Sequence, residues 1–135
     1  MAPMIWWQQL ALVMAGGALG AAGRFWMGGF LLRQLGTGFP WGTLAVNLMG
    51  SFLAGFLVVW LEGRGPSAIY WRAFLLVGMM GGLTTFSALM VESLIFARSD
   101  RNGLLLLYLA VSLIAGLALV WLGSRAGAAL GNPGA

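Results

Sequence analysis

The stretch "FLLVGMMGGLTTFSALMVES" (residues 74–93) begins like an apolar membrane helix and then changes character. Apolar residues continue to Met80, after which "GGLTTFS" (81–87) brings two glycines and three hydroxyl side chains together before the apolar pattern resumes. Such a pattern predicts a helix that is broken at Gly81-Gly82, within the depth of a membrane. Irregular backbone persists there only where protein or a water-filled cavity covers it. The stretch therefore indicates a functional site.

The composition around this stretch is that of a membrane protein. Of the 135 residues, 61% are apolar and only 7% are charged, against averages of about half and about a quarter in soluble domains. There is no Cys or His, so a thiolate nucleophile, a disulfide and a Cys or His metal site are excluded. Only three carboxylates are present, and no two have the spacing of a helical acid/base pair. We therefore expect one membrane domain over residues 1–135 that is not an enzyme.

The apolar residues divide into four predicted membrane helices. A bilayer core requires about 20 apolar residues per helix, and each division carries charges, glycine or proline, as in "RQLGTGFP" (33–40) and "EGRGPSA" (62–68). Six tryptophans fall near the span ends, where indole rings lie at the level of the lipid headgroups. The predicted helices cover about residues 5–32, 41–61, 71–97 and 104–123.

The basic residues are all arginines, and they give little information on orientation. They are spread over the turns rather than gathered in a patch, which argues against nucleic-acid binding. With four spans, one side of the membrane carries Arg64, Arg72 and Arg125, and the other carries Arg33, Arg98 and Arg101. Because Lys/Arg asymmetry orients a membrane protein, this balance leaves two interpretations open. Either a weak bias or a host insertase decides, or the chain inserts in both orientations and pairs with itself antiparallel.

Polar side chains recur inside three of the four spans. Thr43, Asn47 and Ser51 are four residues apart and share one helical face, as do Tyr108 and Ser112. The third span adds Thr84, Thr85, Ser87 and Glu92. Each hydroxyl taken alone is explained by hydrogen bonding between helices, with Gly16, Gly20, Gly50 and Gly55 allowing close approach. Stripes on three helices instead favour a bundle with a polar seam.

The chemistry of this seam favours a small anion. Amide and hydroxyl donors outnumber carboxylates, and donors of this kind replace the hydration shell of an anion. Phe86 adds a ring whose edge is the positive end of its quadrupole. A broken helix also frees carbonyls, which hold a monovalent cation, and N–H groups, which favour an anion. The interrupted stretch is therefore predicted to be an ion site.

These residues together resemble the Fluc (CrcB) family of fluoride channels. The similarity lies in "GGALGAAGRF" (16–25), "FPWGTLAVNLMGSFLAGF" (39–56), "GGLTTFSALMVE" (81–92) and "YLAVSLIAG" (108–116), in the order and spacing of the family. The resemblance implies a passive channel that exports fluoride across the bacterial inner membrane. It also implies an antiparallel, dual-topology homodimer of four-helix protomers, surrounded by lipid, with two pores and a structural Na⁺ at its centre.

The resemblance further implies roles for individual residues. Asn47 corresponds to the pore asparagine and Phe86 to the first of two phenylalanines that line the fluoride pathway. Tyr108 and Ser112 correspond to a polar track on the fourth helix, and Glu92 to the acid at its rim.

Other implied roles concern the interrupted stretch and the first span. The backbone carbonyls of Gly81 and Thr84 correspond to the Na⁺ ligands. From the polar pattern itself we also expect Thr85 and Ser87 in the fluoride pathway and Arg24 at its rim or vestibule.

One position departs from the family pattern T-T-F-S-x-F. The second ring is replaced by Leu89. This leaves two alternatives: one ring of the aromatic pair is dispensable, or the chain conducts fluoride more slowly.

Two other functions compete with this interpretation. A small dual-topology, proton-coupled cation or multidrug exporter has a similar size, but it needs a buried carboxylate in its first helix, where this chain has Arg24 and no acid. In a structural subunit of a larger membrane complex, the polar stripes would serve only to join helices.

Overall fold

A computed structural model describes residues 6–131 of the chain and contains no strand within that range. Three continuous helices, α1 (Trp6–Leu35), α2 (Trp41–Trp60) and α6 (Asn102–Gly131), flank a composite third span. Each of the four spans is long and apolar enough to cross a membrane. The predicted all-α membrane protein with four spans is thus confirmed. The predicted start of the first helix at residue 5 lies outside the described residues.

The third span, Ala68–Arg98, consists of four helical segments. A short α3 (Ala68–Trp71) leads into a π-helix, η1 (Arg72–Met80), which is followed by α4 (Gly81–Leu83) and α5 (Phe86–Arg98). Between α4 and α5, Thr84 and Thr85 have extended backbone conformations. We expected the interruption at Gly81-Gly82, but both glycines are helical and the non-helical residues are the two threonines.

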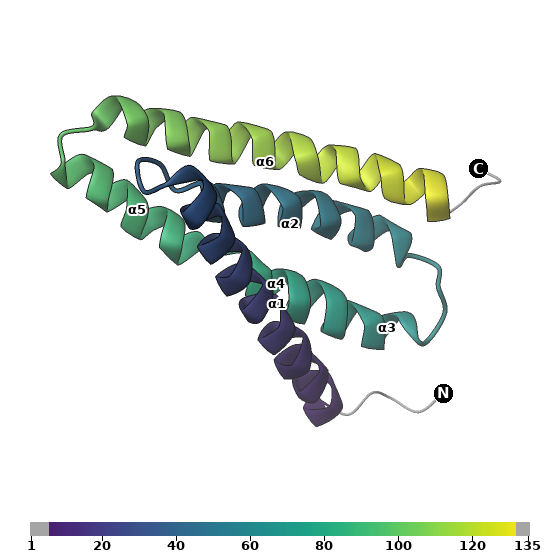
Figure 1. Cartoon of the computed structure of the whole chain (residues 1–135). Helices are drawn as coiled ribbons and strands as arrows, with labels where there is room; N and C mark the ends of the chain where they lie inside the picture. Colours follow the sequence, from purple (N-terminus) through teal and green to yellow (C-terminus); the bar gives the residue numbers. More distant parts are fainter. Residues whose placement is uncertain (1–5, 132–135) are drawn as a thin grey trace.

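The four spans pack as two pairs (Figure 1). Helices α2 and α6 lie side by side, and α1 crosses the third span obliquely, with its main contacts to η1. The α1–η1 crossing brings the two backbones unusually close. A Cβ on Gly16 would collide with the carbonyl oxygen of Phe74, and one on Gly20 with that of Met79. Gly16 and Gly20 are about one turn apart on the α-helix α1, and the carbonyls of Phe74 and Met79 are about one turn apart on the π-helix η1. Each glycine therefore meets one carbonyl on successive turns.

Helix α6 extends beyond its predicted end at residue 123. Gly123, Gly127 and Gly131 form a stripe at four-residue spacing that lies against α2 at Phe52, Phe56 and Trp60. Because small residues let membrane helices approach closely, this stripe continues the α2–α6 packing to Gly131.

The four glycines that the sequence assigned to close helix contacts lie at such contacts. Beyond the two on α1, Gly50 faces the Thr84 side chain and Gly55 faces the Val120 carbonyl.

Candidate functional site

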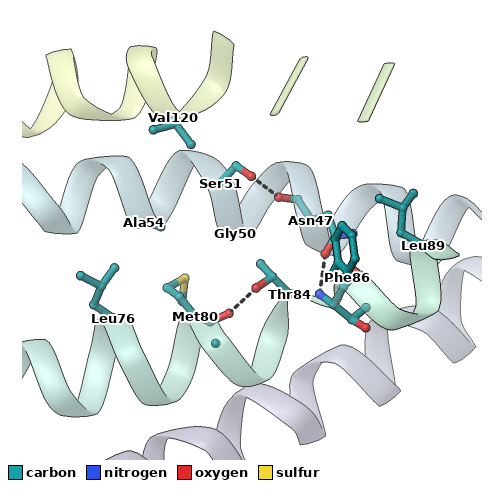
Figure 2. A pocket seen from close by; sticks show the side chains of 12 residues that line it. Asn47, Gly50, Ser51, Ala54, Leu76, Met80, Thr84, Phe86, Leu89 and Val120 are labelled. Atoms are coloured by element: carbon teal, nitrogen blue, oxygen red, sulfur yellow. Dashed lines mark hydrogen bonds between the residues drawn. The ribbon is translucent and has the colours of Figure 1, made fainter. Parts of the chain in front are cut away.

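The interruption of the third span is held by a side chain from another helix. Asn47 on α2 accepts a hydrogen bond from the Thr85 N–H through Oδ1 (2.7 Å) and donates one from Nδ2 to the Thr85 carbonyl (3.0 Å). The Asn47 amide thus takes the place of the two hydrogen-bond partners that the N–H and carbonyl of Thr85 would have in a continuous helix. Figure 2 shows part of this pairing. Unpaired backbone groups cost several kcal/mol each in a membrane, so this pair stabilises the break.

Two further contacts complete the support of the break. The Thr85 hydroxyl accepts the Ala88 N–H at 3.2 Å and caps the start of α5. On the other side of the break, Arg24 of α1 donates from Nε to the Gly82 carbonyl at 3.2 Å. The residues that the sequence placed at this site therefore come from three different spans.

Several backbone groups at the break remain without a hydrogen-bond partner among residues 6–131. They are the N–H groups of Phe86 and Ser87 and the carbonyls of Gly81, Leu83 and Thr84. The N–H groups lie at the positive end of the α5 dipole. The break therefore offers donors on its α5 side and acceptors on its α4 side.

Three of these residues, Gly81, Thr84 and Phe86, line an open cavity of about 430 Å³, whereas Leu83 and Ser87 do not. Figure 2 shows α2 on one side of it, η1 and α4 on the other, and Phe86 beside Asn47. Phe86 is 74% exposed, so its ring is available at the cavity rather than packed in the protomer. The lining contains no charged side chain and consists of Asn47, Gly50, Ser51, Ala54, Leu76, Met80, Gly81, Thr84, Thr85, Phe86, Leu89 and Val120.

A second polar cluster surrounds the carboxylate of Glu92. Thr43 on α2 donates to Oε1 at 2.6 Å, and the Tyr108 hydroxyl on α6 donates to Oε2. Tyr108 is completely buried, and Phe39 and Phe96 pack edge-on against its ring. Both carboxylate oxygens are thus held by neutral hydroxyl donors from neighbouring helices.

A cavity of about 470 Å³ lies beside this cluster, and Arg24, Thr43, Thr85 and Glu92 contribute to its lining. Thr85 also lines the cavity beside Phe86. Thr85 therefore belongs to the wall between the two cavities, and Asn47 binds it from the cavity beside Phe86. Arg24, predicted at a rim, lines the larger one.

The remaining predicted pathway residues take different positions. Ser87 is exposed, with its hydroxyl 3.5 Å from that of Thr85. The hydroxyl oxygen of Ser112 is buried and is the one such side-chain atom without a partner among residues 6–131. Ser51 donates to the Asn47 carbonyl of its own helix at 2.7 Å, so its hydroxyl hydrogen is used within α2.

Leu89, the position that departs from the family pattern, lies between the packed core and the cavity. It is buried in a cluster with Leu44, Phe96 and Tyr108, and it also contributes to the lining of the cavity beside Phe86. A phenyl ring at this position would therefore have to displace part of the packed core.

Two residues of the site were given no individual role from the sequence, although Thr43 was placed on the polar seam. Thr43 is a direct partner of Glu92, and Phe39 covers Tyr108. The four-residue spacing from Thr43 to Asn47 was the available signal for the first. Nothing in the local pattern indicated the second, because Phe39 lies in the turn before α2.

Four helices able to span a membrane, an interrupted third span and a cavity lined by one amide and no charged side chain define the class of this molecule as an all-α membrane protein. A family model described as CrcB-like protein, Camphor Resistance (CrcB), matches residues 11–124. The chain belongs to this CrcB family.

Similar proteins agree with this membership over most of their length. A protein of Xanthomonas euvesicatoria pv. vesicatoria is 62% identical over 123 residues, which cover 91% of this chain and 92% of the relative. One of Xylella fastidiosa strain 9a5c is 58% identical over 93% and 87%, and one of Thermus thermophilus is 46% identical over 91% and 96%. All three are named fluoride-specific ion channel FluC. Membership of a family of ion channels confirms the expectation that the protein is not an enzyme.

Proposed function

We propose that this chain forms a passive, fluoride-selective channel that exports fluoride across the bacterial inner membrane. The observation that carries the proposal is the break between α4 and α5. It presents the free N–H group of Phe86 and an exposed phenyl ring to a cavity whose lining contains no carboxylate. Donors and a ring edge stabilise an anion, whereas a cation would need the carbonyl side of the break.

The two polar clusters suggest a path for the ion. The anion passes from the Arg24 and Glu92 cavity, across the wall that contains Thr85, to the cavity beside Phe86. Asn47 uses one Nδ2 hydrogen for Thr85, and its second Nδ2 hydrogen is the donor we assign to the ion. The buried hydroxyl of Ser112 and the Tyr108–Glu92 pair form the polar track beside it.

The pathway requires a second copy of the chain. Unpaired carbonyls and hydroxyls at an open cavity are not tolerated against lipid tails, and Gly81, Ser87 and Phe86 are all exposed in the single chain. An antiparallel homodimer would cover these groups and provide two pores, with lipid around the outer faces. The equal division of arginines between the two sides removes the bias that would oppose dual insertion.

A Na⁺ ion at the dimer centre fits the carbonyl side of the break. The carbonyls of Gly81 and Thr84 have no hydrogen-bond partner among residues 6–131, and backbone carbonyls are suitable Na⁺ ligands. No cluster of His, Cys, Asp or Glu that could hold another metal occurs in this range. Two carbonyls from each protomer would supply the ligands, and the bound charge would hold the two breaks together.

Ion selectivity in proteoliposomes tests the proposed function. Purified protein should release fluoride rapidly down its gradient while chloride scarcely moves. Equal release of both ions, or no release by correctly folded dimers, would contradict it. Release by a purified homodimer would also exclude the role of an assembly subunit.

A proton-coupled exporter is not favoured by either the family or the site. Helix α1 contains no Asp or Glu, and its one charged side chain within the polar site, Arg24, is bound to the Gly82 carbonyl. The carboxylate that proton exchange needs in the first helix is therefore missing.

Dual insertion makes a quantitative labelling prediction. The chain has no Cys, so Thr37→Cys and Ser67→Cys, made separately, place single probes in turns on opposite sides of the membrane. An impermeant thiol reagent on intact cells should label each variant to about half of its total, because half of the chains insert each way. Complete labelling of one variant and none of the other would establish a single orientation.

The aromatic contribution is tested by a pair of variants. Phe86→Ile removes the exposed ring and should strongly slow fluoride release, since isoleucine has no positive ring edge. Leu89→Phe restores the ring of the family pattern, and we expect release at least as fast as that of the native chain. Because Leu89 is buried, overpacking should also cost about 1–3 kcal/mol of stability. Rates are measured per folded dimer, beside the melting temperature. Normal release by Phe86→Ile would remove the ring from the mechanism.

A further inference from the structure

The turn between α2 and α3 encloses a cavity that the ion pathway does not use. It measures about 360 Å³ and is lined by Trp60, Leu61, Arg64, Ser67, Trp71 and Leu75. Trp60 ends α2 and Trp71 ends α3. Because indole rings at the ends of membrane helices lie at headgroup level, the mouth of this cavity is at the membrane interface.

Two contacts orient the guanidinium of Arg64 at this cavity. Its Nε donates to the Trp60 carbonyl at 3.1 Å, and its central carbon lies 4.1 Å from the centre of the Trp60 ring. Gly63 and Gly65, on either side of it, have positive φ angles of 72° and 83°, a conformation that favours glycine. The two terminal nitrogens of Arg64 take part in no hydrogen bond among residues 6–131. They form the paired donor edge that binds phosphate.

The rest of the cavity combines a second polar group with an apolar wall. Ser67 adds an exposed hydroxyl, whereas Leu61 is only 2% exposed and Leu75 is partly buried. Arg72, whose Nη2 donates to the Val58 carbonyl at 3.1 Å, adds a second positive charge at this end of α2. The one carboxylate of the turn, Glu62, does not line the cavity.

We propose that this cavity binds an anionic phospholipid, with the phosphate on Arg64 and Ser67 and an acyl chain along Leu75 and Trp71. The cationic mouth attracts the anionic headgroup, and the apolar wall distinguishes a lipid from free phosphate, which would leave that wall in contact with water. The proposal uses no residue of the fluoride pathway, so it holds or fails independently of the proposed conduction.

Native mass spectrometry of the purified protein tests the proposal directly. The protein is incubated in detergent with phosphatidylglycerol or with phosphatidylcholine, and the lipid retained per chain is counted. We expect phosphatidylglycerol to be retained preferentially and Arg64→Gln to lower its occupancy about tenfold, to the phosphatidylcholine level. Arg64→Lys keeps the charge but loses the paired donors, so its occupancy should be intermediate.

A matched control separates this site from general charge effects. Arg33→Gln removes the same charge from the last turn of α1 and should leave phosphatidylglycerol occupancy unchanged. Fluoride release by Arg64→Gln should equal that of the native chain, which confirms that the variant is folded. Equal retention of the two lipids, equal losses in the Arg33 and Arg64 variants, or displacement of the lipid by millimolar inorganic phosphate would each overturn the proposal.

Discussion

Asn47→Asp is expected to slow fluoride release by roughly three decades. A carboxylate about 4 Å from a passing anion repels it by about 4 kcal/mol at an effective dielectric constant of about 20, and each 1.36 kcal/mol is a factor of ten in rate. Aspartate also lacks the N–H that Asn47 donates to the Thr85 carbonyl. The same change therefore removes a support of the helix break and places a negative charge beside it.

Two controls separate these effects in the proteoliposome assay. Ser51→Ala alters the lining of the same cavity, but the Ser51 hydroxyl serves only the carbonyl of its own helix, so release should stay close to native. Asn47→Leu removes both bonds to Thr85 without adding charge, and it should slow release less than Asn47→Asp does. Native rates in folded Asn47→Asp would exclude Asn47 from the pathway.

Gly123→Ala is expected to destabilise the fold by about 3 kcal/mol, at the upper end of the cost of overpacking. The added Cβ would collide with the Phe52 carbonyl oxygen and lie 3.0 Å from the Phe56 nitrogen. Both are backbone atoms of α2, which cannot move aside as a flexible side chain can. The melting temperature of the detergent-solubilised protein measures the effect.

Gly103→Ala is the matched control on the same helix. A Cβ at Gly103, the second residue of α6, meets nothing within 4 Å, so alanine adds no clash there and has the higher helix propensity. The control should therefore melt at or slightly above the native temperature. If Gly123→Ala melts no lower than Gly103→Ala, the close α2–α6 approach does not stabilise the protein.

The amino-acid sequence predicted the spans well because each one has to cross the same hydrocarbon thickness. It located the break less well. Gly82 pointed to a break in the helix, yet it packs against the Gly17 carbonyl as part of a helix contact. The actual signal was Thr85, which caps the α5 helix and belongs to a residue type common at helix starts.

The partners of the polar residues were harder to predict than the residues themselves. Membrane depth marks Asn47 and Glu92 as polar groups that need partners, but it does not say which. Asn47 binds the backbone N–H and carbonyl of Thr85. Every residue other than proline has these groups, so the residue type gives no sign of the contact. Glu92 binds Thr43 and Tyr108 across two helix interfaces, and these contacts depend on how the spans pack.

The bond between Asn47 and Thr85 also bears on how the protein is made. Its two residues are 38 positions apart, and synthesis proceeds from the N-terminus, so the amide enters the membrane before the backbone that it will bind. Until the third span arrives, the Asn47 amide lacks the hydrogen-bond partners that it has in the folded protein. An assembly in which Asn47 does not meet Thr85 leaves the amide without this partner inside the membrane, at a cost of several kcal/mol, so the contact that holds the helix break also favours the native packing of the second span against the third.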